Sequence, residues 1–266
     1  MSETVLLNIS QGVATLTLNR PEIHNAFDDL VIHQLVQHLE SLAIRKELRL
    51  LVLASEGKSF SAGADLNWMR RMKDLSLEEN ARDASALARL MSLLNGFPLP
   101  TIAVVQGAAF GGAVGLVACC DIALASSKAS FSLSEVKVGL VPATISPYVL
   151  QAIGSRAARR LFLTGERFSA QEALKLGLVH EVVEPDQLGT QKEALIQTLL
   201  NNGPEALKTA KNMIFQVANQ PINDELIAYT TQLIAQIRIS EEGQEGLSAF
   251  LEKRSPNWVH LNRGEK

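Results

Sequence analysis

One apolar stretch, Thr101 to Ser127, constrains the fold of this chain more than any other. It opens with a β-branched run, breaks at Gly107 and resumes in an apolar segment dense enough for a buried helix. Residues 102–120 contain one polar side chain and approach the length of a membrane span. The four glycines in this segment and the charge of Asp121 at its end instead favour a strand, a tight turn and a helix in a soluble core.

A glycine turn that opens a helix exposes backbone N–H groups, and the helix dipole makes them attractive to negative charge. The chain has two such turns after apolar strands, Ala62-Gly63-Ala64 and Phe110-Gly111-Gly112. If the two turns meet, one amide from each can bind a single carbonyl oxygen, which stabilises an enolate-like transition state by several kcal/mol.

Composition and charge narrow the class of protein. The chain has 266 residues, 47% of them hydrophobic, and can bury a large core. Its net charge of −3, with both signs interspersed, favours a small-molecule substrate over nucleic acid or a membrane surface. The neighbouring Cys119 and Cys120 are expected to pack as small hydrophobic residues. The N-terminal residues lack the pattern of a signal peptide, so we expect a cytoplasmic protein.

The order of predicted elements indicates an α/β fold. Residues 5–18 predict a hairpin, residues 28–42 an amphipathic helix and residues 50–54 a strand covered on both faces. Strand and helix signals alternate up to about residue 203, and only helical patterns follow. We therefore predict a core over residues 1–203 and an all-helical region over residues 204–266.

Few residues carry an obvious catalytic signal. The sequence has no zinc-spaced Cys/His set, nucleophile elbow, P-loop or dinucleotide-binding glycine motif. Glu135 lies in a largely apolar stretch, where burial would raise its pKa and suit it to proton transfer, although a structural glutamate at a helix start looks the same. Asp65 and Asp121 are expected to cap a helix or accept a buried hydrogen bond.

One series of motifs extends over nearly the whole chain. It comprises residues 18–21 with Asn25-Ala26, residues 60–66, 107–122 and 131–142, and residues 163–165 with Ala173 and residues 177–179. These motifs resemble those of the crotonase family, the enoyl-CoA hydratase/isomerase superfamily. The resemblance implies a spiral of ββα units, a C-terminal helical trimerisation region, a homotrimer or dimer of trimers, and acyl-CoA thioester substrates without a metal or redox cofactor.

The same resemblance assigns a site. It places an oxyanion hole on the backbone amides of Ala64 and Gly112, and an acid/base role on Glu135. The residues that it implies for binding the CoA part of the substrate are His24, Ala26, Ala62, Asp65, Leu66 and, from the C-terminal helical region, Phe250 and Lys253.

The sequence departs from the family pattern at two places. Family hydratases typically use two glutamates, and the first of these falls on Gly115, while the second matches Glu135. We expect the room left by Gly115 to hold an ordered water or the distal carboxylate of a substrate. Residues 143–146, Ala-Thr-Ile-Ser, also replace the usual glycine-rich run after Pro142, so the acyl pocket is expected to differ.

Three functions remain open. Residues 60–72 and 110–121 closely resemble bacterial methylglutaconyl-CoA hydratases of leucine and isovalerate breakdown, and favour hydration of 3-methylglutaconyl-CoA. An enoyl-CoA isomerase needs a single carboxylate, which Glu135 would supply. A CoA-binding scaffold without activity is the third possibility. A dehalogenase of the superfamily is set aside, because its nucleophilic aspartate would fall on Ala143.

Overall fold

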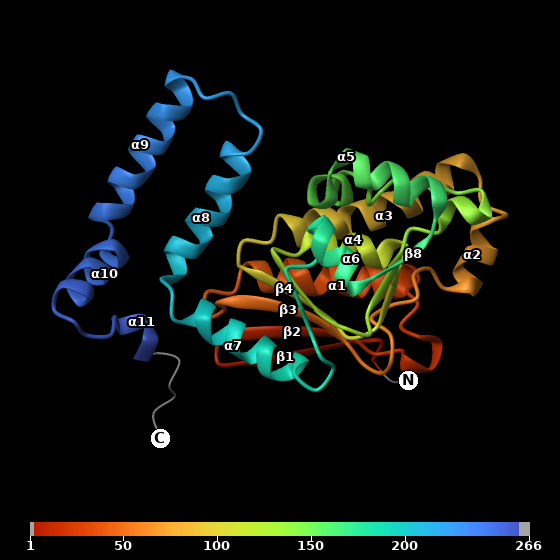
Figure 1. Ribbon diagram of the computed structural model, residues 1–266, viewed down its shortest axis with the longest axis horizontal. Coiled ribbons are helices and arrows are strands. Elements are labelled where there is room, and N and C mark those ends of the chain that lie inside the picture. The colour runs from red at the N-terminus through yellow and green to blue at the C-terminus, as the bar shows by residue number, and fades with distance from the viewer. Residues whose placement is uncertain (1–2, 261–266) are drawn as a thin grey trace.

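The chain folds into a layered α/β structure, and a computed structural model describes residues 3–260 of it (Figure 1). The larger sheet has the strand order β1-β2-β3-β4-β6-β9, and the smaller sheet has the order β5-β7-β8. In the larger sheet β1 and β2 are antiparallel and the other neighbours are parallel. The strands are β1 (Val5–Ser10), β2 (Val13–Leu18), β3 (Leu50–Ser55), β4 (Thr101–Val105), β5 (Ala108–Phe110), β6 (Ile122–Ser126), β7 (Ser130–Ser132), β8 (Arg167–Ser169) and β9 (Glu181–Val183).

Helices cover both faces of the larger sheet, which confirms the predicted α/β class. The strand residues Leu51 and Leu53 pack toward α1, α3 and α4, whereas Leu50 and Val52 pack toward α7. This explains why β3 is apolar along its whole length. The helices are α1 (Asp29–Ala43), α2 (Leu66–Met72), α3 (Leu77–Asn95), α4 (Gly112–Cys119), α5 (Ser146–Thr164), α6 (Ala170–Leu176), α7 (Leu188–Leu200), α8 (Pro204–Val217), α9 (Asp224–Ile239), α10 (Glu241–Leu251) and α11 (Asn257–His260), with 3-10 turns η1 (Pro21–Ile23) and η2 (Glu135–Val138).

Most of the predicted elements are present. The N-terminal hairpin turns through Gln11 and Gly12, both with positive φ, and α1 begins after Asp28, whose side chain accepts a hydrogen bond from the Val31 amide. Sequence reasoning missed α7 and the short strands β5, β8 and β9, because three-residue strands carry no readable periodicity. The long helix α5 is interrupted at Gly154, where φ is 72° and ψ is 159°.

The C-terminal helices extend away from the sheets. Figure 1 shows α9 and α10 standing beyond α8, with α8 between them and the core. The buried amine of Lys211 fixes α8 to the core, since it donates to the Leu99 carbonyl (3.1 Å) and to Asp121 Oδ2 (2.7 Å). No helix within residues 3–260 combines the length and the apolar character needed to cross a membrane.

Candidate active site

The turn that contains Ala64 is held against a neighbouring segment by a parallel bridge. The Phe27 amide donates to the Gly63 carbonyl (2.9 Å), and the Asp65 amide donates to the Phe27 carbonyl (3.0 Å). In this pattern the residue between the two partners, Ala64, directs its own N–H and C=O away from Phe27. The Ala64 amide is therefore not used by the bridge.

The two glycine turns lie directly against each other. The Phe110 amide donates to the Ser61 carbonyl (3.0 Å), which ties the segment before one turn to the segment before the other. Gly63 has a φ of +92°, and a Cβ atom on it would lie 2.9 Å from the Phe110 carbonyl oxygen. A side chain at position 63 would therefore separate the turns, and only glycine permits both this backbone conformation and this approach.

The Phe27 side chain links the same two turns. A Cβ atom on Gly112 would lie 2.6 Å from Phe27 Cζ, so the ring packs against the first residue of α4 while the Phe27 backbone holds the Ala64 turn. Within residues 3–260, neither the Ala64 amide nor the Gly112 amide donates a hydrogen bond to another group. Two unused N–H donors on adjacent turns are the arrangement that an oxyanion hole requires.

The Glu135 carboxylate lies beside the second turn. It is the first residue of η2, and a Cβ atom on Gly111 would lie 3.3 Å from Glu135 Oε1. Glu135 Oε2 is buried and has no hydrogen-bond partner among the described residues. Burial, which disfavours the charged form, raises the pKa of Glu135 above its usual range. A carboxylate with these properties is suited to accept and return a proton.

The space expected next to Gly115 is filled, so the prediction that it holds a water or a substrate carboxylate is wrong. A Cβ atom on Gly115 would lie 2.3 Å from Ile145 Cγ2 and 3.3 Å from Met91 Sδ. Ile145 is 1% exposed. The physical reason is packing: the absence of a side chain at position 115 lets a neighbouring apolar side chain occupy the volume that a glutamate would need.

The ion pairs of Arg20 order the segments around the first turn. Its Nη1 donates to the Ala26 carbonyl and to Asp28 Oδ2, both at 3.0 Å, and its Nη2 donates to Asp65 Oδ2 at 3.3 Å. Asp65 also caps α2, because its Oδ1 accepts from the Asn67 amide at 2.7 Å. The predicted capping role is confirmed, and both oxygens of this carboxylate are used inside the chain.

The residues predicted to bind CoA fall into two separate groups. Those near the first turn lie together: the Ala62 amide donates to the His24 carbonyl (2.9 Å), Arg20 holds the Ala26 carbonyl, and the Leu66 side chain is 69% exposed. Phe250 is 81% exposed and belongs to α10, and Lys253 follows it.

Within one chain, Phe250 and Lys253 lie apart from the other residues predicted to bind CoA, so their role in CoA binding stays a prediction. Figure 1 shows α10 and α2 at opposite ends of the molecule. The reason is that α8 leads away from the core, and α9 and α10 follow it outward.

The remaining candidate groups have structural surroundings. Asp121 accepts hydrogen bonds from the Thr101 amide and hydroxyl, as predicted for a structural carboxylate. Burial raises the pKa of the Cys120 thiol to about 12, and Cys119 Sγ lies 3.7 Å from Met91 Sδ, so both cysteines are packing residues. Within the described part of the chain, no three His, Cys, Asp or Glu side chains are grouped to hold a metal ion.

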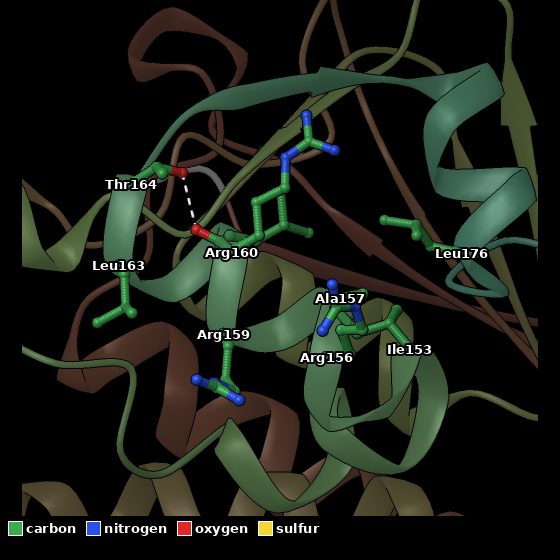
Figure 2. Close-up of a pocket in the computed structure, with 9 residues that line it drawn as sticks. Ile153, Arg156, Ala157, Arg159, Arg160, Leu163, Thr164 and Leu176 are labelled. Atoms are coloured by element: carbon green, nitrogen blue, oxygen red, sulfur yellow. Dashed lines mark hydrogen bonds between the residues drawn. The ribbon is translucent and has the colours of Figure 1, made fainter.

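A hollow of about 710 Å³ lies elsewhere, on the outer side of α5. Arg156, Arg159 and Arg160 line it together with apolar side chains that include Leu163. Figure 2 shows that the Arg160 side chain extends away from the other two arginines, so the three guanidinium groups do not converge on one point. None of the predicted site residues lines this hollow.

Sequence reasoning missed two residues that shape the site, Phe27 and Ile145. Phe27 follows the Asn25-Ala26 motif directly, and its position beside that motif was the available signal. Ile145 belongs to the run that replaces the glycine-rich segment, but its contact with Gly115 spans thirty residues of sequence and carries no local pattern.

Comparisons with known proteins show which family this chain is similar to. The family model of enoyl-CoA hydratase/isomerase matches residues 8–261. The crystal structure of an enoyl-CoA hydratase from Shewanella pealeana superimposes with a TM-score of 0.93 at 49% identity, covering 96% of each chain. The 2,3-dehydroadipyl-CoA hydratase of Escherichia coli is 34% identical over 97% of this chain and 99% of its own length.

An isomerase is also among the relatives. The trans-2-decenoyl-acyl-carrier-protein isomerase of Streptococcus mutans is 31% identical over 96% of this chain and 97% of its own length. Hydratases and an isomerase thus both match this chain over nearly their whole length. From its match to the family model and to these relatives, the chain belongs to the enoyl-CoA hydratase/isomerase family.

Proposed function

We propose that this protein hydrates an α,β-unsaturated acyl-CoA thioester with Glu135 as the single acid/base group. The observation that carries the proposal is the position of a half-buried carboxylate beside two adjacent turns whose amides are unused; its buried Oε2 has no partner among the described residues. Relatives named as hydratases support this reaction class.

The proposed mechanism uses the backbone and one side chain. The thioester oxygen accepts hydrogen bonds from the Ala64 and Gly112 amides, which stabilise the negative charge that collects there as water attacks the β-carbon. Glu135 accepts a proton from the attacking water and delivers it to the α-carbon. Hydrogen and hydroxyl are thereby added across the double bond, and the carboxylate is regenerated.

The proposed substrate is 3-methylglutaconyl-CoA. The support comes from the likeness of residues 60–72 and 110–121 to hydratases of leucine and isovalerate breakdown. Because Ile145 occupies the space next to Gly115, we propose that the distal carboxylate of this substrate binds at another part of the site.

The proposed assembly is a trimer of this chain, or a dimer of trimers. Its support is the apolar surface that α8, α9 and α10 leave uncovered in one chain, including Ile214 (61% exposed), Ile239 (80%) and Leu251 (76%). Burying such side chains against a second copy is favourable. In this assembly Phe250 and Lys253 would reach the CoA of a neighbouring copy.

A second candidate function is double-bond migration. The observation that favours it is the filled space at Gly115, since moving a proton between C2 and C4 requires one carboxylate and no activated water. The same two amides would stabilise the dienolate in that reaction.

One experiment separates the candidates. The purified protein is incubated with 3-methylglutaconyl-CoA, crotonyl-CoA and a 3-enoyl-CoA, and the products are identified by mass spectrometry. Hydration, fastest for 3-methylglutaconyl-CoA, supports the first proposal. Migration of the 3-enoyl double bond without hydration supports the isomerase, and binding without any product contradicts both.

A further inference from the structure

One face of α4 leads from the proposed catalytic carboxylate into the interior of the protein. Gly111 is the residue before this helix, and Gly115 and Cys119 within it are spaced four residues apart, so these two line the same face. Position 111 faces Glu135 and position 115 faces Ile145. The sulfur of Cys119 meets Met91, which also borders position 115.

The distance along this face sets a length limit. A helix rises about 1.5 Å per residue, so position 115 lies about 6 Å beyond position 111. A chain that follows this face from the Glu135 carboxylate covers that distance with about five carbon–carbon bonds, because bonds of about 1.5 Å joined at tetrahedral angles each advance the chain by about 1.25 Å. It then meets the side chains of Ile145 and Met91.

The obstacle at this depth is fixed. Ile145 is 1% exposed and Met91 is fully buried, so both are enclosed by the core. Ile145 precedes α5 directly, and its carbonyl accepts a hydrogen bond from the Val149 amide at 3.1 Å. Its β-branched side chain has few alternative rotamers.

We infer that Ile145 is a specificity-determining residue that closes the acyl pocket one helical turn beyond Glu135, and that the protein selects acyl-CoA thioesters with short acyl chains of about four to six carbons. This rests on the proposed function, because it takes Glu135 and the adjacent amides as the place where the thioester binds. The glutaconyl chain of the proposed substrate is within the limit.

The test measures binding of unreactive, saturated thioesters to the full-length protein by calorimetry, from butanoyl-CoA through hexanoyl-CoA and octanoyl-CoA to decanoyl-CoA. The wild type is expected to bind decanoyl-CoA at least tenfold more weakly than butanoyl-CoA. Ile145→Ala is expected to remove most of this difference. Ile153→Ala, which removes the same atoms from a buried position facing the hollow of Figure 2, is expected to retain it.

Equal binding of all four thioesters by the wild type would overturn the inference, as would an unchanged length dependence in folded Ile145→Ala. If Ile145→Ala does not fold, Ile145→Val is measured in its place. Its affinity for octanoyl-CoA should then rise relative to its affinity for butanoyl-CoA, and the absence of such a rise overturns the inference. Because binding is measured without turnover, a length-dependent protein that converts none of the unsaturated thioesters supports the inference and contradicts the proposed hydration.

Discussion

Gly115 and Ile145 form a complementary pair: a Cβ atom on Gly115 would lie 2.3 Å from Ile145 Cγ2, closer than Cβ atoms approach other atoms in proteins. The two departures from the family pattern, a glycine for a glutamate and an apolar run for a glycine-rich one, are therefore one structural change. It replaces a carboxylate by a packed isoleucine and leaves Glu135 as the carboxylate proposed to transfer the proton.

Gly115→Ala is expected to destabilise the protein by about 1–3 kcal/mol, because a methyl group is forced into a packed contact. Urea unfolding monitored by circular dichroism measures the change. Gly189→Ala is the matched control, since Gly189 lies in α7 with nothing within 4 Å of its Cβ position. The control should be neutral or more stable by up to about 1 kcal/mol. Equal stabilities of the two variants would refute the packing described for Ile145.

Glu135→Gln is expected to lower turnover by about two to four orders of magnitude, the range for a lost proton-transfer group. Steady-state kinetics with the substrate identified by the thioester panel give the comparison. Glu172→Gln changes a carboxylate that pairs with Arg160 at the surface of α6, and should keep near-normal turnover. A Glu135→Gln enzyme with wild-type activity would remove Glu135 from the mechanism.

The stability of the protein should respond to pH through Glu135. Burial raises its pKa in the folded state, so the folded chain holds this proton more tightly than the unfolded chain. That stabilising contribution is present below the unfolded-state pKa and is lost as pH rises through the folded-state pKa. Glu135→Gln should therefore exceed the wild type in thermal stability at pH 7, and the difference should shrink toward pH 5. If the difference in thermal stability instead grows as pH falls, the folded protein stabilises the ionised form of Glu135, and the prediction is wrong.

Phe27→Leu is expected to lower kcat more than it raises KM, because the Phe27 ring and backbone together set the distance between the two turns. Phe131→Leu is the matched control: Phe131 is fully buried and stacks on Phe168, with ring centroids 5.6 Å apart. Both variants should lose about 1–2 kcal/mol of stability. Parallel losses of kcat in the two variants would mean that Phe27 acts only through general packing.

Lys211→Met is expected to destabilise the protein by about 2–3 kcal/mol. The change leaves the Asp121 carboxylate without its cationic partner. The loss of stability stays below that for a fully buried ion pair, because the Asp121 side chain is 27% exposed. Lys208→Met breaks the exposed pair with Glu205 on the same helix and should cost less than about 0.5 kcal/mol. Denaturant unfolding of both variants provides the measurement, and similar losses would contradict the anchoring role of Lys211 for α8.

Local sequence was sufficient for the longer helices and strands other than α7, and for the chemical character of the candidate groups. The glycine turns before α2 and α4, the cap at Asp65 and the desolvated setting of Glu135 follow from preferences that act over a few residues. Such preferences are readable because helix starts, turns and apolar periodicity each have a short-range physical cause.

Only the tertiary structure decided how distant segments share space. Phe27 joins two turns that lie far from it in sequence, Ile145 fills the volume beside Gly115, and the outward course of α8 to α10 carries Phe250 away from the first turn. These outcomes depend on close packing among residues remote along the chain. A missing side chain in the sequence therefore predicted an open space, and the folded chain filled it.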